Sequence, residues 1–358
     1  MPADADAPPA SSGPLVLGTR GSALALAQTR LTFAALQAAV PGLRCEVREI
    51  RTTGDKRQDL SLTHLAPGGH GYDPTATVDG TPPPPAITAE TPAGRIDPGL
   101  FTKELEAELL AGTIHVAVHS LKDLPTALPA GLVLAAVLPR AATPDVLIYK
   151  EPGSALLPPF AVLPFLPPGA TVATSSLRRQ FQLLRARPDL RVCEVRGNVG
   201  TRLQKLHDHA DWSALVLALA GLDRLGFDVT DGRPLKTADG LRFRTAILGP
   251  DVMLPAVGQG AIGLQARADD ADTLAALAAV NHAPTWAAVT AERELLRLLG
   301  GGCQLPLGIH TGADSSAGTL AMDAVLFGAT LEVPVRTARF AGPLADPASV
   351  AAGLFARL

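Results

Sequence analysis

One short stretch of the chain, residues 174–202, concentrates arginine. Its candidate ligand-binding arginines are Arg178, Arg179, Arg196 and Arg202. The formal net charge of the whole protein is -3, so a basic cluster here indicates a local site rather than a face for a polyanion. A guanidinium group binds a carboxylate or phosphate through two parallel hydrogen bonds, so four of them suit a ligand with several such groups. The alternative, that they are solvated helix charges, fits Arg185 and Arg187 well.

The pattern around these arginines predicts the elements that position them. Residues 171–173 are β-prone, and the following Thr-Ser-Ser is a suitable cap for a helix over residues 177–186. Pro188 ends that helix, residues 192–195 are strand-like, and residues 197–200 turn into another helix. The arginines then lie at strand ends or in first helical turns, which share one edge of a parallel sheet.

One other segment has the same strand, polar turn, helix construction. Residues 15–17 are predicted to form a strand, and the turn containing Arg20 leads to Ser22, which suits the N-cap of a helix over residues 23–39. This turn is not the glycine fingerprint of a dinucleotide site.

A strand predicted over residues 114–118 runs directly into His119, Ser120, Leu121, Lys122 and Asp123. Such a position presents polar side chains at the edge of a sheet, where they are able to do chemistry. An ordinary polar turn before Pro125 explains the same residues equally well.

Composition limits the class of protein. The chain has 358 residues, of which 47% are hydrophobic and 18% charged, which predicts a soluble globular protein of two or three domains. No apolar run is long enough to span a membrane, and the acidic, Pro-rich start resembles neither a signal peptide nor a transit peptide. We therefore expect a cytoplasmic protein with no membrane partner. A net charge near zero also argues against nucleic acid.

The three cysteines are far apart and form no CxxC pair. This favours a reducing compartment and argues against a disulfide framework or a structural zinc site, so we expect no metal. A lone cysteine is most often an inert buried residue, and Cys45 and Cys193, in strand-like segments, fit that interpretation. Cys303 fits it less well, because it follows three consecutive glycines on a predicted loop.

The order of elements predicts an α/β protein with two lobes, a ligand cleft between them, and a small α+β C-terminal domain. Pro-rich crossings at 139–144 and 255–260 join the lobes and would serve as hinges. The predicted units are a disordered leader (1–13), a first lobe (14–138 and 257–280), a second, Arg-rich lobe (144–254) and a third domain (284–358). Within the first lobe, residues 53–98 are dense in Pro, Gly and Thr and predict a long mobile loop. In the third domain we expect a helix over 285–299 and strands over 307–310, 320–327 and 332–340.

Several long motifs resemble the porphobilinogen deaminase (hydroxymethylbilane synthase) family. They are LGTRGSALALAQT from Leu17, FTKELE from Phe101, HSLKDLPT from His119, TSSLRRQ from Thr174, RGNVGTRL from Arg196, LAGLDRLG from Leu219, LPAVGQGA from Leu254, and the cysteine of the glycine loop, Cys303. They occur in the family's order and cover nearly the whole chain apart from the leader and the 53–98 segment.

The resemblance implies lobes similar to periplasmic binding proteins and a dipyrromethane cofactor held by a thioether to Cys303. It implies an enzyme that joins four porphobilinogen molecules head to tail, releases ammonia each time and frees hydroxymethylbilane by hydrolysis, in tetrapyrrole synthesis. It also implies a monomer. Each pyrrole carries an acetate and a propionate, so the growing chain is a polycarboxylate, as the arginine cluster suggests.

The resemblance also assigns roles to residues. Asp123 matches the catalytic aspartate, which would stabilise positive charge on pyrrole species and relay protons. The implied cofactor-binding residues are Cys303, Lys122, Ser120, Thr174, Ser176, Arg178, Arg179, Arg196 and Gly197. The implied substrate-binding residues are Arg20, Ser22, Arg202, Arg224, Gln259 and Phe101.

One region departs from the family's pattern. The family usually has a lysine shortly before the Leu-Phe that begins the first-domain helix, whereas here Asp97, Pro98 and Gly99 precede Leu100 and Phe101. Lys56 or another residue would have to supply that contact.

Two alternatives stay open at this point. A non-catalytic two-lobed protein that binds a polycarboxylate would need the same cleft, although Cys303 and Asp123 argue against it. A relative that has kept the fold and lost turnover would also have these motifs.

Overall fold

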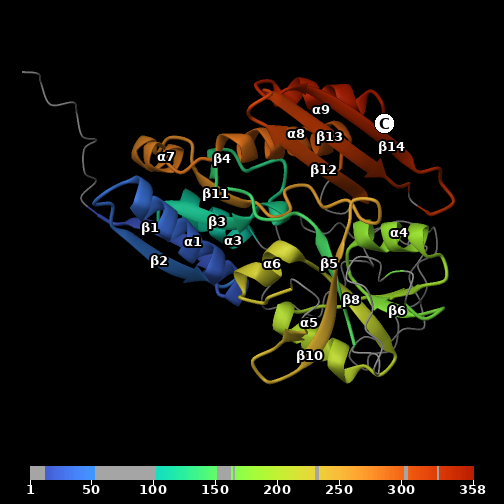
Figure 1. The fold of residues 1–358 in the computed structure, drawn as a ribbon. Coiled ribbons are helices and arrows are strands. Elements are labelled where there is room, and N and C mark those ends of the chain that lie inside the picture. The colour runs from blue at the N-terminus through green and yellow to red at the C-terminus, as the bar shows by residue number, and fades with distance from the viewer. Residues whose placement is uncertain are drawn as a thin grey trace, which may run out of the picture.

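The computed structural model describes residues 13–52, 102–150, 163, 166–229, 234–301, 305–328 and 330–358. The predicted leader apart from Gly13, the whole predicted loop at 53–98, Phe101 and Cys303 lie outside these residues. In the described part the chain forms three sheets, each with its own helices (Figure 1).

The first sheet has five strands in the order β2-β1-β3-β11-β4. They are β1 (Leu15–Arg20), β2 (Cys45–Ile50), β3 (Val116–Ser120), β4 (Leu132–Val137) and β11 (Ile262–Arg267). β1 is parallel to β2 and β3, whereas β11 is antiparallel to both β3 and β4. The sheet is therefore mixed, but the strands that lead into the candidate residues are parallel, as expected.

Both faces of this sheet are covered, because apolar residues alternate along its strands. Leu15 and Leu17 of β1 pack with Leu36 of α1 (Ala23–Ala39) and Leu277 of α7 (Ala271–Ala278) on one face. Val16, between them, packs on the other face with residues of α3 (Lys103–Leu110).

The second sheet has six strands in the order β7-β6-β8-β5-β10-β9. They are β5 (Asp145–Tyr149), β6 (Thr171–Ala173), β7 (Arg191–Cys193), β8 (Trp212–Ala218), β9 (Leu235–Lys236) and β10 (Arg242–Leu248). β6, β7 and β8 are parallel, and β5 is antiparallel to β8 and β10. The helices of this unit are α4 (Leu177–Ala186), α5 (Val199–Asp208) and α6 (Leu219–Arg224).

The third sheet is antiparallel and consists of β12 (Leu307–Asp314), β13 (Thr319–Leu326) and β14 (Arg336–Pro343). One face of it packs on α8 (Ala283–Leu298) and α9 (Pro347–Phe355), through residues such as Leu295, Met322 and Leu354.

Several predicted elements have the bounds that the sequence suggested, and others differ for local reasons. The helices at 23–39 and 177–186 and the strand at 171–173 agree with the prediction. The strand predicted over 192–195 ends at Cys193, because the backbone N–H and C=O of Val195 bond to the hydroxyl of Ser175 and not to a strand. The last strand begins at Arg336 and not at residue 332, because residues 331–332 form a turn and Pro334, which has no N–H to donate, follows it.

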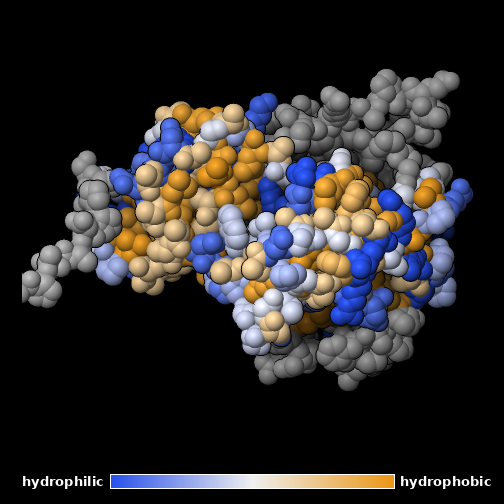
Figure 2. Space-filling model, turned by 90° about the horizontal axis from the view of Figure 1, so that it is seen from above, coloured by the Kyte–Doolittle hydropathy of each residue, from blue (hydrophilic) through white to orange (hydrophobic). Residues whose placement is uncertain are grey.

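Hydrophobic residues also reach the surface. Seen from above, they gather on the half of the molecule that holds the five-stranded sheet, and hydrophilic residues are more frequent on the other half (Figure 2). Scattered apolar residues at the surface are ordinary for a folded protein. In the described part of the chain no helix is both long and apolar enough to cross a membrane.

The two crossings between the lobes meet at one buried carboxylate. Glu292 of α8, which is fully buried, binds Arg140 of the first crossing through both oxygens, at 2.6 and 3.0 Å. It also accepts a hydrogen bond of 2.7 Å from the backbone N–H of Gly258 in the second crossing. A buried charge that loses its partner is strongly destabilising, so this carboxylate ties both crossings to the third sheet's helix.

We predict that Glu292→Ala lowers the free energy of unfolding by about 3–5 kcal/mol, because the buried guanidinium of Arg140 would lose its carboxylate. Urea denaturation measures this difference. Glu294→Ala is the matched control, since Glu294 lies on the same helix and pairs with the solvent-exposed Arg297. An equal loss of stability in both variants would contradict the role given to Glu292.

Candidate functional site

The predicted site residues of the first lobe lie where β1 and β3 end. Arg20 is the last residue of β1, and Ser120 is the last residue of β3. Lys122 and Asp123 follow in a single 3₁₀ turn, Leu121–Asp123. Leu121 is buried in this turn while the side chain of Asp123 is exposed, so the turn directs a carboxylate away from the core.

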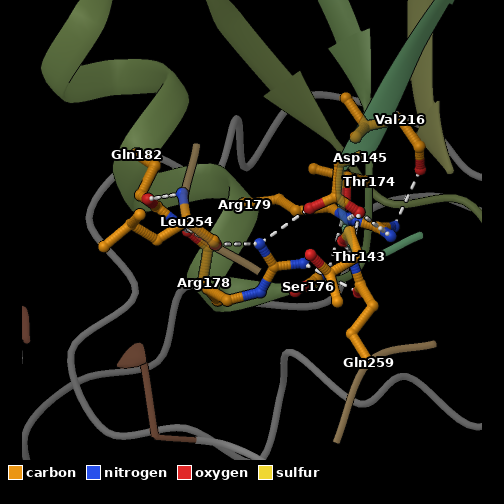
Figure 3. Close-up of polar contacts among 10 residues, drawn as sticks. All are labelled: Thr143, Asp145, Thr174, Ser176, Arg178, Arg179, Gln182, Val216, Leu254 and Gln259. Atoms are coloured by element: carbon orange, nitrogen blue, oxygen red, sulfur yellow. Dashed lines mark hydrogen bonds and ion pairs between the residues drawn. The ribbon is translucent and has the colours of Figure 1, made fainter. Parts of the chain in front are cut away.

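Arg178 and Arg179, in the first turn of α4, share one protein carboxylate. Asp145, at the start of β5, is fully buried; its Oδ1 lies 2.7 Å from Nη2 of Arg179, and its Oδ2 lies 2.8 Å from Nη1 of Arg178 (Figure 3). Arg179 also donates from Nη1 to the carbonyl of Val216 at 2.8 Å. The two guanidinium groups hold the pKa of Asp145 well below its usual range.

The same cluster reaches the second crossing. Arg178 donates from Nη1 to the carbonyl of Leu254 at 2.6 Å, and Gln182, one turn further along α4, bonds both the N–H and the C=O of Leu254. Gln259 donates to Oδ1 of Asp145 at 3.1 Å and to the carbonyl of Thr143 at 2.6 Å (Figure 3). The first turn of α4 is therefore fastened to both crossings.

Arg196 and Arg202 lie in the next strand-to-helix turn. Arg196 is paired with Glu194 at 2.6 Å, and Arg202 donates from Nε to the carbonyl of Gly197 at 2.8 Å. Gly197 has a φ of 104°, and a Cβ there would lie 2.7 Å from Cγ2 of Thr201, so the turn requires glycine. Asn198 caps α5 by accepting a hydrogen bond from Thr201 N–H.

Thr174 and Ser176 form the turn between β6 and α4. The Oγ1 of Thr174 accepts a hydrogen bond from Ser176 N–H at 3.2 Å. Ser176 occupies the predicted N-cap position, but its side chain makes no cap hydrogen bond. Thr174 is buried and Ser176 is partly exposed. Both belong to the turn that leads directly into the arginine pair of α4.

Cationic side chains of both lobes lie near Asp123. Burial lowers the pKa of Lys122 to about 8, and Arg179 and Arg178 lower it further while Asp123 and Asp145 oppose the shift. Burial similarly lowers the pKa of Arg202 to about 10; Arg179 and Arg196 act in the same direction and Asp123 against it. Asp123 thus lies close enough to cations from both lobes to oppose the lowering of their pKa values.

The remaining predicted residues have other contacts. Ser22 caps α1 by accepting from Ala25 N–H, as expected, and Ser120 exchanges hydrogen bonds with Gln28 of α1 at 2.8 and 3.1 Å. Arg224, at the end of α6, donates to the carbonyl of Gly260 in the second crossing at 2.6 Å. Phe101 and Cys303 are outside the described residues.

The sequence analysis missed Asp145, the residue on which the arginine pair depends. Its only signal is its position, directly after Pro144 at the start of the second lobe. It also missed Glu194, whose side chain binds Arg196. Asp145 and Glu194 belong to the chain itself. The guanidinium groups of Arg178, Arg179 and Arg196 therefore already bind a protein carboxylate, and the four arginines are not all open to a ligand.

A polycarboxylate such as dipyrromethane fits the residues that are present. The Nε of Arg178 is buried without a hydrogen-bond partner in the described residues, and an unmade buried hydrogen bond is costly. A bound carboxylate would satisfy a donor of this kind and would raise the lowered pKa values of Lys122 and Arg202. Among the described residues no group of His, Cys, Asp and Glu is arranged to hold a metal ion.

The fold and the site define a class: a two-lobed α/β protein with a cationic site for a polyanion where the lobes meet. The family model "Porphobilinogen deaminase, dipyromethane cofactor binding domain" matches residues 15–71 and 88–275, and "Porphobilinogen deaminase, C-terminal domain" matches residues 286–353. The chain belongs to the porphobilinogen deaminase family. It has the cofactor-binding domain of that family and is an enzyme of the transferase class. The first match extends into the 53–98 segment from both sides and omits only residues 72–87.

Curated relatives agree with this assignment. A porphobilinogen deaminase of Desulforudis audaxviator (strain MP104C) is 45% identical over 294 residues, covering 82% of this chain and 78% of the relative. One from Synechococcus sp. (strain CC9311) is 39% identical over 345 residues, covering 96% and 92%. These matches support the catalytic interpretation and not the non-catalytic binding protein.

Solved structures with a similar arrangement include a probable amino-acid ABC transporter extracellular-binding protein, ytmK from Bacillus subtilis. It is 7% identical, covers 81% of this chain and 99% of its own, and has a TM-score of 0.40, too low to support an argument.

The lowered pKa of Lys122 predicts a pH dependence of stability. Between about pH 8 and the usual lysine pKa of about 10.4, the unfolded chain binds a proton at Lys122 that the folded protein does not. The free energy of unfolding must rise with pH across this window, because the unfolded state binds more protons. In a Cys303→Ser background, which lacks the thiol of the predicted attachment site, we expect this rise in the parent and not after Lys122→Met. Parallel urea titrations from pH 7 to pH 10 measure it, and identical pH profiles would show that Lys122 titrates normally.

Proposed function

We propose that the protein is a hydroxymethylbilane synthase that joins four porphobilinogen molecules head to tail with loss of ammonia and then releases hydroxymethylbilane by hydrolysis. The observation that carries this proposal is the group of cations from both lobes, Lys122, Arg179 and Arg202, close to the Asp123 carboxylate. Such a site suits substrates that carry two carboxylates each and that become positively charged as they react. The substrate partner is porphobilinogen.

Asp123 is assigned the catalytic role. As ammonia leaves the aminomethyl group of porphobilinogen, positive charge develops on its pyrrole ring, and a nearby carboxylate stabilises that charge. The same carboxylate oxygen is able to accept a proton from the pyrrole nitrogen and return it. The side chain of Asp123 is exposed, so a substrate is able to reach it.

The other predicted residues bind and orient. Arg20, Ser22, Arg202, Arg224, Gln259 and Phe101 are assigned to the substrate, and Ser120, Lys122, Thr174, Ser176, Arg178, Arg179, Arg196 and Gly197 to the cofactor. Arg178 and Arg179 are the residues most constrained in this role, because Asp145 already binds both. For these two, we propose that the guanidinium groups present the ligand with a fixed positive charge, with the N–H of Arg178 Nε as a free donor.

Dipyrromethane, attached by a thioether to Cys303, would supply the pyrrole carbon on which the chain is extended and a tether that keeps the growing product in place. Cys303 is assigned this attachment from the family's motif. Lys122 and the turn at Thr174 would meet the cofactor's carboxylates.

The organisation proposed for the chain follows the three sheets. Residues 14–138 with 257–280 form the first lobe, residues 144–254 the second, and residues 284–358 the C-terminal domain that carries the attachment cysteine. We propose that the enzyme works as a cytoplasmic monomer without nucleic acid or membrane partners.

The mass of the purified protein tests the cofactor. We expect the wild type to be heavier than its sequence by two pyrrole units, and Cys303→Ala to have the mass of its sequence alone. Intact-protein mass spectrometry of both, before and after incubation with porphobilinogen, makes the comparison. A wild type that stays at its sequence mass after incubation would remove the basis of the proposed mechanism.

Substitution of the catalytic carboxylate tests the chemistry. Asp123→Ala should lower kcat by at least about 100-fold, because general acid–base catalysis contributes about 10²–10⁴-fold. The variant should still gain the cofactor mass, which separates catalysis from cofactor attachment. Asp211→Ala, which removes an exposed aspartate of the second lobe, is the control. Ordinary turnover by Asp123→Ala would contradict the role of this residue.

A further inference from the structure

One face of α8 covers the segment that carries Lys122 and Asp123. Trp286 and Val289 of α8 pack in one hydrophobic cluster with Leu121 and Leu124, the residues that flank the pair. Positions 286, 289 and 293 follow helical spacing and lie on the same face, so Arg293 is directed at this segment from the next turn.

Arg293 binds the backbone directly after Asp123. Its Nη1 donates to the carbonyl of Leu124 at 2.9 Å, and its Nη2 donates to the carbonyls of Pro125 and Thr126 at 2.7 and 3.4 Å. No regular secondary structure is present at these three residues, so their carbonyls have no ladder partners there. The planar guanidinium group is suited to hold several acceptors in one fixed arrangement, which an ammonium group does not do.

The position of the Asp123 carboxylate depends on this backbone. The Asp123 side chain is exposed, and among the residues that the structure describes no hydrogen bond holds its carboxylate in place. Its direction is therefore set by the 3₁₀ turn and by the segment that follows it. Contacts on the turn's apolar side come from α8, and the polar contacts that follow come from Arg293.

We propose that Arg293 is a positioning residue for the reaction. It fixes the segment 124–126 against α8, so that the Asp123 carboxylate and the helix that leads toward Cys303 keep one relative arrangement during turnover. This proposal rests on the proposed function, in which Asp123 acts on a chain attached at Cys303. Glu292, the preceding residue, holds the crossings, so two consecutive residues of α8 fix the catalytic turn and the hinge together.

Arg293→Ala and Arg293→Lys test the proposal, and Arg297→Ala is the matched control. Arg297 lies one turn further along α8, where it pairs with Glu294 in solvent. All proteins are prepared as holoenzymes, with the cofactor load of each checked by intact mass, and kcat and KM are measured with porphobilinogen. A displacement of about 1 Å in a catalytic group costs about 100-fold in rate.

For Arg293→Ala we expect a fall in kcat of about 10- to 100-fold with KM changed by less than about twofold. Arg293→Lys should recover part of the loss, since its ammonium group is able to reach one of the carbonyls, and Arg297→Ala should match the wild type. Amide hydrogen exchange of peptides covering residues 121–128 should rise in Arg293→Ala and not in Arg297→Ala, while exchange in the second lobe stays unchanged.

Three results would overturn the proposal: wild-type turnover in Arg293→Ala, equal losses in Arg293→Ala and Arg297→Ala, or a loss of turnover in a folded Arg293→Ala that missing cofactor explains. If Arg293→Ala does not fold, Arg293→Lys and Arg293→Gln, which each keep a donor, are compared by the same assays. A wild type that carries no cofactor and shows no turnover would contradict the proposed function instead, and the exchange comparison would still test the contact of Arg293 with the segment.

Discussion

The burial of Asp145 between two arginines is the interaction on which the rest of the site depends. A fully buried carboxylate is stable only when it is paired and hydrogen-bonded, and Asp145 has Arg178, Arg179 and Gln259 as partners. These three come from the first turn of α4 and from the second crossing, while Asp145 itself begins β5. The start of the second lobe, its first cleft helix and the return of the chain to the first lobe are thus fixed by one charge.

This arrangement separates two uses of positive charge. Arg178 and Arg179 are largely committed to holding the crossings, whereas Lys122 and Arg202 have their pKa values lowered by neighbouring cations and by burial. Arg178 and Arg179 fix the positions of the crossings. For Lys122 and Arg202, the charged form becomes more favourable when an anion binds nearby. A ligand with many carboxylates therefore meets a preorganised field and does not have to assemble it. Preorganisation of this kind matters for a product chain that gains two carboxylates with each addition.

Much of the fold was predictable because its signals are local. Apolar spacing and caps define α1 and α4, and the strand at residues 171–173 and the turn at Gly197 follow from short patterns. The partners of the arginines were not predictable, because Asp145 lies more than thirty residues before Arg178 and Arg179 and nothing near it in sequence indicates the contact. The end of β7 was misjudged for a similar reason: the hydroxyl of Ser175 replaces a strand partner at Val195. Long-range polar contacts carry no periodicity, so pattern analysis does not find them.

The exposed carboxylate of Asp123 is held in position through the backbone of its turn, by contacts on the side that faces α8. A carboxylate that is open to solvent has few side-chain contacts to hold it, so its position depends on its backbone. Here the turn is anchored on its apolar side by Leu121 and Leu124 against α8, and its continuation is held by the guanidinium group of Arg293. Because α8 also carries Glu292, this one helix contacts both crossings and the turn that carries Asp123.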